Sequence, residues 1–127
     1  MKDDQQHVLI IGFVWPEPNS SAAGKRMLEL IHLFKNQGWK VTFASSAAKT
    51  DHMTNLQDMG VDQFSVKMNS STFDEFVGEL NPSIVLFDRF VVEEQFGWRV
   101  AEQCPHALRI LDTEDLHFLR RERKKAH

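Results

Sequence analysis

The chain has 127 residues, of which 42% are hydrophobic and 26% charged, and its formal net charge at pH 7 is -3. These values are typical of one globular domain and exclude a long disordered chain, while the negative total argues against a nucleic-acid-binding domain. The first apolar run, residues 8–15, is too short to span a membrane and lacks a basic start, so we expect a cytoplasmic protein.

The first half of the chain alternates apolar runs with amphipathic ones. A buried strand is expected over residues 7–14, because this run is almost continuously apolar and rich in β-branched residues. A helix is expected from near Ser21 to Gly38, since its apolar residues recur at helical spacing and a glycine follows them. After it come, in order, a strand over 39–46, a weaker helix over 51–59 and a short strand over 61–66.

The second half continues this alternation. Thr72 and Glu75 form a capping-box pattern, which predicts a helix over 73–80. After a strand over 83–88, apolar residues recur every four positions as far as Cys104, so we expect a helix whose lone cysteine packs in the core. The last expected elements are a strand over 108–111 and a helix from Glu114 that continues into a basic run.

Strands that alternate with helices are typical of a parallel sheet with right-handed crossovers. We therefore expect one Rossmann-like α/β domain over residues 1–127, with a doubly wound parallel sheet of five strands and three α/β/α layers. The strand order should be 3-2-1-4-5. Ligands bind such sheets at the carboxyl ends of the strands, at the switch point between strands one and four.

Familiar nucleotide and metal motifs are absent from this sequence. No G-x-G-x-x-G spacing occurs between Gly12 and Gly24, as a dinucleotide site requires. Gly24-Lys25 lacks the earlier glycine of a phosphate loop, and Arg26 stands where a magnesium-binding serine or threonine would be needed. No pair of histidines has the spacing of a metal site with a third ligand, so neither a cofactor nor a metal is expected.

Polar residues follow the first and fourth strands at the carboxyl edge of the predicted sheet. Those that come after the first strand are Glu17, Asn19, Ser20 and Ser21. Together with the first helix's N-terminal amides they can bind an anionic substrate, although the serines can equally serve as helix caps. Asp88 and Arg89 follow the fourth strand and either bind substrate or form a solvated ion pair in a loop.

Three acids and a histidine lie within residues 112–117, after the fifth strand. Helix capping alone can explain the acids, but it does not explain His117. A carboxylate beside an imidazole orients it for proton transfer, so His117 and Asp115 are candidate catalytic residues, with Glu114 as a candidate substrate contact. The basic run over 120–125 is interpreted as a solvated helix face, with a nucleic-acid patch as the alternative.

Four segments carry a resemblance to a known family: VLIIGFVWPEPNSSAAGKRM, LFKNQGWKVTFASS, PSIVLFDRF and LRILDTEDLHFLRRER. In this layout the chain resembles the N-terminal domain of retaining, family-four-like glycosyltransferases of the GT-B fold. The resemblance implies transfer of a sugar from a nucleotide-sugar donor to an unknown acceptor, which this acceptor-side domain would hold. It also implies that the loop up to Gly24 approaches the donor diphosphate and that residues 115–117 line the cleft.

The sequence departs from that family in two places. Ser21-Ala22-Ala23-Gly24 replaces a Gly-Gly pair in the first loop, and the C-terminal donor domain with its paired glutamates is absent from these residues. By the resemblance, this fragment alone should therefore be inactive.

The alternative hypothesis is a stand-alone, flavodoxin-like binding or interaction module without catalysis. If a partner domain normally covers the cleft, exposed Trp15 and Phe90 would drive self-association into a homo-oligomer.

Overall fold

A computed structural model describes residues 6–17, 22–49 and 55–112 of the chain. The described elements are β1 (His7–Gly12), α1 (Ala22–Asn36), β2 (Lys40–Ser45), the 3-10 helix η2 (Leu56–Met59), β3 (Asp62–Ser65), α2 (Ser71–Leu80), β4 (Ile84–Asp88), α3 (Phe90–Gln103) and β5 (Leu108–Asp112). None of the described helices combines the length and apolar character needed to cross a bilayer.

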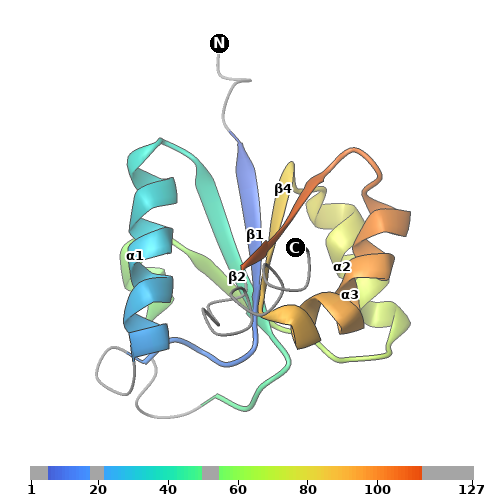
Figure 1. Cartoon of the computed structure of the whole chain (residues 1–127). Coiled ribbons are helices and arrows are strands. Elements are labelled where there is room, and N and C mark those ends of the chain that lie inside the picture. The colour runs from blue at the N-terminus through green and yellow to red at the C-terminus, as the bar shows by residue number, and fades with distance from the viewer. Residues whose placement is uncertain (1–5, 18–21, 50–54, 113–127) are drawn as a thin grey trace, which may run out of the picture.

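The five strands form one parallel sheet in the order β3-β2-β1-β4-β5. α1 lies on one face of this sheet, and α2 and α3 lie on the other (Figure 1). The expected doubly wound, Rossmann-like α/β/α fold is therefore confirmed, including its strand order.

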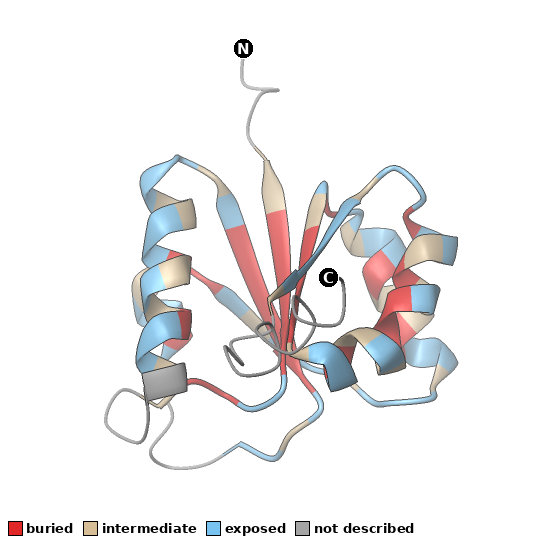
Figure 2. Ribbon diagram, viewed as in Figure 1, coloured by how far each residue is buried: buried red, intermediate tan, exposed pale blue. Residues whose placement is uncertain are grey.

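Two apolar cores lie on the two faces of the sheet, because successive strand residues point to opposite sides. Leu9 of β1 packs with Phe73 of α2 and Phe96 of α3, whereas the neighbouring Val8 packs with Ile31 of α1. The central strands are buried on both faces, while β5 is largely exposed (Figure 2).

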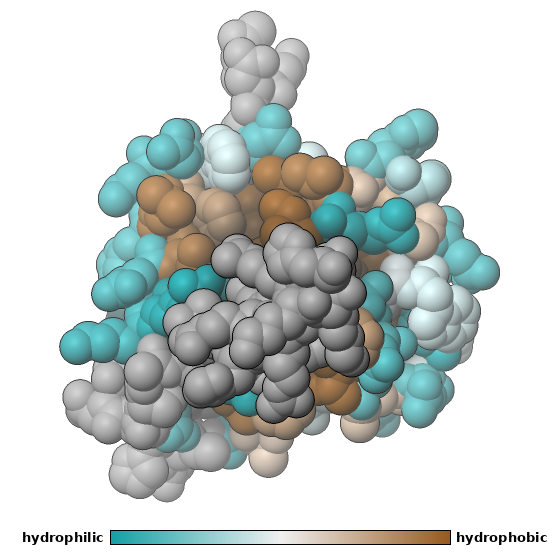
Figure 3. Space-filling view, in the orientation of Figure 1, coloured by the Kyte–Doolittle hydropathy of each residue, from teal (hydrophilic) through white to brown (hydrophobic). Residues whose placement is uncertain are grey.

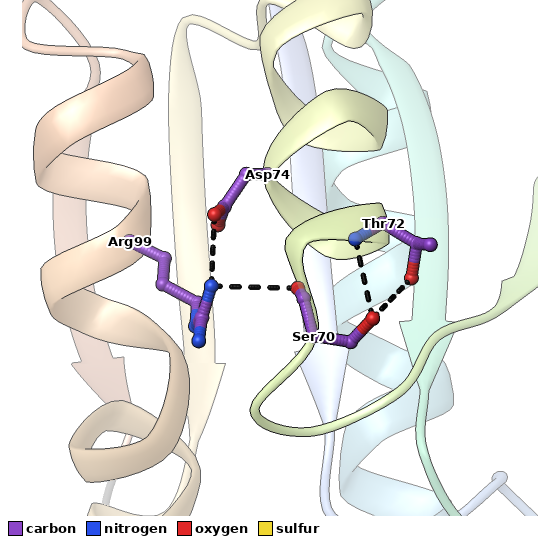
Figure 4. Close-up of polar contacts among 4 residues, drawn as sticks. All are labelled: Ser70, Thr72, Asp74 and Arg99. Atoms are coloured by element: carbon purple, nitrogen blue, oxygen red, sulfur yellow. Dashed lines mark hydrogen bonds and ion pairs between the residues drawn. The ribbon is translucent and has the colours of Figure 1, made fainter.

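Two predicted boundaries are corrected by local hydrogen bonds. β1 ends at Gly12, because the next N–H, that of Phe13, donates to a side chain of β4 and not to the sheet. α2 begins two residues earlier than expected, at Ser71, with Ser70 as its N-cap: Oγ of Ser70 accepts from the N–H of Thr72 at 3.2 Å (Figure 4). The capping box predicted at Thr72 is therefore wrong, since Thr72 already lies inside the helix.

The weaker helix is present only in a reduced form within the described residues. It is the 3-10 turn η2, which Asn55 caps by accepting from the N–H of Gln57. Gly60 ends it with a φ of 77°, a left-handed conformation that suits glycine. Residues 51–54 of this predicted helix lie outside the described residues.

Candidate functional site

The candidate site lies at the carboxyl ends of β1, β4 and β5, around two carboxylates on neighbouring strands. Asp88 ends β4 and Asp112 ends β5, and the register of the two parallel strands pairs them with each other. The side chains of Asp88 and Asp112 are only 6% and 10% exposed. Two acids are therefore held side by side at the edge where open α/β sheets bind their ligands.

Asp88 connects the end of β4 to the loop that follows β1. Its Oδ2 accepts a hydrogen bond from the N–H of Phe13, with 3.1 Å between the two atoms. Its Oδ1 lies 3.8 Å from Nε of Arg89 and is buried with no hydrogen-bond donor among the described residues. The expected ion pair with Arg89 is therefore present, but its carboxylate is buried at the end of β4 and not solvated in a loop. Among the described residues, one oxygen of this carboxylate has no hydrogen bond.

Arg89 is held in an unusual backbone conformation between the two acids. Its φ is 82°, a region that non-glycine residues adopt at a cost of about 1–3 kcal/mol. Its N–H donates to the carbonyl of Asp112 at 2.7 Å, and its guanidinium lies 4.8 Å from the ring centre of Phe13. These contacts hold the backbone of Arg89 against the end of β5 and its guanidinium over the ring of Phe13.

Asp112 is paired with an arginine of α1, 86 residues earlier in the sequence. The Nη2 atom of Arg26, on α1, lies 2.7 Å from Oδ1 of Asp112. Oδ2 of Asp112 is buried and has no hydrogen-bond partner within the described ranges. Each acid thus has an arginine nearby and, among the described residues, one oxygen without a hydrogen bond. In Asp88 this is the oxygen that faces Arg89, whereas in Asp112 it is the oxygen that does not contact Arg26.

The loop after β1 packs closely on the first turns of α1. A Cβ placed on Gly24 would lie 2.6 Å from the carbonyl oxygen of Glu17, so only glycine allows this approach. Trp15 in the same loop is 3% exposed, and its indole N–H donates to the carbonyl of Ala47 at 2.9 Å. The expectation that Trp15 is exposed is therefore wrong, whereas Phe90 is 50% exposed as expected.

Only part of the predicted site falls within the described residues. The structure brings Asp88 and Arg89 together with Asp112, and it places Glu17 against Gly24. The other predicted site residues lie outside the described residues: Asn19, Ser20, Ser21, Glu114, Asp115 and His117. Their predicted roles, including proton transfer by His117 and Asp115, stay predictions.

Two contributors to the site were missed by sequence reasoning. The sequence alone identifies Arg26 only as a residue that does not fit a phosphate loop, and it predicts Phe13 to be part of the buried strand. One feature of the sequence could have pointed to Arg26 as a site residue: it lies near the start of α1, next to the carboxyl ends of the strands. Its partner Asp112 is 86 residues away in the sequence, so the pairing itself leaves no local pattern.

The chemistry of this site is that of polar recognition. Among the described residues no group of three histidine, cysteine or acidic side chains is placed to hold a metal ion. Burial raises the pKa of the Cys104 thiol, which packs in the core and donates to the carbonyl of Val77, away from this edge.

Comparison of the chain with protein-family models, with curated proteins and with solved structures gives no match.

Proposed function

We propose that the chain is the N-terminal, acceptor-side domain of a GT-B glycosyltransferase, which transfers a sugar from a nucleotide-sugar donor to an acceptor. The observation that carries the proposal is the pair of register-matched carboxylates, Asp88 and Asp112, each with one oxygen that lacks a hydrogen bond within the described residues. Sugar hydroxyls are donors that can satisfy such oxygens, which are otherwise costly to bury.

The groups around the two acids also suit a sugar derivative. The guanidiniums of Arg26 and Arg89 supply donors for hydroxyl or phosphate oxygens, and their side chains are 50% and 36% exposed. The ring of Phe13, 44% exposed, adds an apolar surface beside them. A ligand that displaces the arginines from the acids would therefore exchange two ion pairs for hydrogen bonds of its own.

In this proposal a second domain holds most of the donor, and His117 with Asp115 transfers the proton at the reacting sugar. The 127-residue chain alone then gives no measurable transfer and only weak donor binding, because most of the contacts belong to the other domain. Calorimetry with a panel of nucleotide sugars tests this point. Tight donor binding by this chain would contradict the proposed division of roles.

The decisive experiment is a donor screen with the full-length gene product, followed by two substitutions. Replacing Asp88 with Asn keeps the acceptor for the Phe13 N–H but weakens sugar binding, so kcat/KM should fall about tenfold or more. His117→Ala should lower turnover about 10²-fold with the fold intact. Asp58→Asn, at an exposed position of η2, is the matched control. Unchanged turnover in His117→Ala together with lost thermal stability would make the histidine structural and overturn its catalytic role.

One observation favours the alternative, an interaction module without catalysis. Phe13, Val14 and Phe90 expose 44%, 48% and 50% of their surface near the same strand ends. Exposed apolar groups that gather at one edge are typical of protein-binding surfaces. An open reading frame that continues for about another domain of 100–200 residues favours the enzyme. The absence of any donor that binds the full-length protein would favour the module.

A further inference from the structure

β5 is an edge strand that is unusually apolar for its position. It pairs with β4 alone among the described strands, and its exposed apolar residues are Leu108, Ile110 and Leu111, at 59%, 37% and 37%. The opposite edge, β3, has the more polar sequence DQFS. Edge strands are normally short, charged or covered, because their free backbone groups invite another strand. β5 is short and carries one exposed charge, Arg109, but no other described strand or helix covers its free edge.

The exposed residues of β5 lie on both faces of the sheet. The register places Leu108 and Ile110 beside Ile84 and Leu86 on the face of α1, where neither β5 residue belongs to the core. In Figure 3, which looks onto this edge, apolar surface extends between α1 and β5. The α1 face is therefore apolar up to the edge of the sheet.

The other face of β5 carries charge. Arg109 and Leu111 lie there beside Val85 and Phe87, and together with Glu93 of α3 they border an open hollow. Although Glu93 and Arg109 border the same hollow, they form no ion pair with each other in the described part of the chain. An acid of α3 and a base of β5 thus border the same hollow without being paired with each other.

We propose that β5 pairs with β5 of a second copy of this chain, antiparallel, across a two-fold axis at Ile110. Pairing in this register sets Ile110 against the same residue of the partner subunit and sets Arg109 against Leu111 of the partner subunit. Since Leu111 borders the hollow that contains Glu93, Arg109 of the partner subunit reaches Glu93, and symmetry forms this ion pair twice. No like charges lie directly opposite one another, and the two sheets join into one.

Sedimentation over a range of concentrations tests the apolar half of this interface. The wild-type chain should dimerise, and Ile110→Lys should raise the dissociation constant about tenfold or more, because two ammonium groups then meet at the axis. Met68→Lys is the control: Met68 is 45% exposed and follows β3, at the other edge of the sheet. A wild-type chain that stays monomeric, or a dimer that Ile110→Lys leaves intact, would overturn the proposal.

A charge exchange tests the register independently of the fold. Glu93→Arg and Arg109→Glu should each weaken the dimer, and the double variant should restore it, because the exchanged charges attract again across the axis. Circular dichroism confirms that each variant is folded. Failure of the double variant to regain affinity would contradict the antiparallel register centred on Ile110. It would leave the proposed sugar chemistry untouched, since neither residue belongs to that site.

Discussion

The two faces of the sheet are covered to different extents. On one face α2 and α3 pack side by side over β1 and β4, and their core includes Phe73 and Phe96 with ring centres 4.7 Å apart. On the other face α1 and the short η2 cover the β1, β2 and β3 side and leave Leu108 and Ile110 of β5 exposed. Stability should therefore depend most on the first face, and association on the second.

The largest expected effect is the loss of a core ring from the α2–α3 face. Phe96→Ala should lower the free energy of unfolding by about 3–5 kcal/mol, because Phe96 is 1% exposed and its removal leaves a cavity. Leu108→Ala on β5 should change it by less than about 0.5 kcal/mol, since Leu108 is 59% exposed. Urea unfolding followed by circular dichroism measures both. Equal losses of unfolding free energy in Phe96→Ala and Leu108→Ala would mean that the two faces contribute equally to stability.

A second contrast sets two helical glycines against each other, one on each face. Gly24→Ala should destabilise the chain by about 1–3 kcal/mol, because the new Cβ meets the carbonyl oxygen of Glu17 at 2.6 Å. Gly78→Ala in α2 meets only Oε1 of Gln103 at 3.4 Å and should stabilise by about 0.5–1 kcal/mol. Thermal melting of both variants measures the difference. A stabilising Gly24→Ala would contradict the close packing of the loop on α1.

The sequence predicts the sheet well, because each strand is an apolar run and each run can be recognised locally. The strand-end rule also predicts Asp88 and Arg89 as neighbours of a site. It does not predict that Asp88 is buried, because the N–H that binds it comes from Phe13, 75 residues earlier. The sequence likewise predicts that Trp15 is exposed, because it gives no sign that the indole N–H donates to the carbonyl of Ala47, 32 residues away. The burial of Asp88 and of Trp15 is therefore set by contacts between residues far apart in the sequence, which no local pattern predicts.

Two ion pairs, one on each face of the sheet, differ in how far their side chains are exposed. Nη1 of Arg99 on α3 lies 2.8 Å from Oδ2 of Asp74 on α2, and these side chains are 12% and 24% exposed (Figure 4). A double-mutant cycle should give a coupling energy of about 1 kcal/mol for this pair. The pair of Arg26 and Asp112 should give about half as much, because its arginine is 50% exposed and solvent screens it. A stronger coupling at Arg26 would contradict the argument from burial.

The smallest effect concerns pH and the start of β1. Burial lowers the pKa of His7 below its ordinary 6.5, with a smaller contribution from the charge of Lys40, while Asp62 opposes both. Nε2 of His7 lies 2.8 Å from Oγ1 of the buried Thr42. A lowered pKa means that the unfolded chain binds the proton more tightly. Stability is therefore complete above pH 6.5 and is lost as the pH falls through the folded-state pKa.

Replacing His7 with Gln should flatten this acid-side loss, because glutamine retains a polar group beside Thr42 but takes up no proton. His32→Gln, at an exposed position of α1, should leave the loss unchanged. Urea midpoints measured between neutral pH and about pH 5 provide the comparison. An equal fall of the midpoint in the wild-type chain and in His7→Gln would mean that other groups cause the acid sensitivity. In that case the burial of the His7 ring would contribute nothing measurable to the dependence of folding on pH.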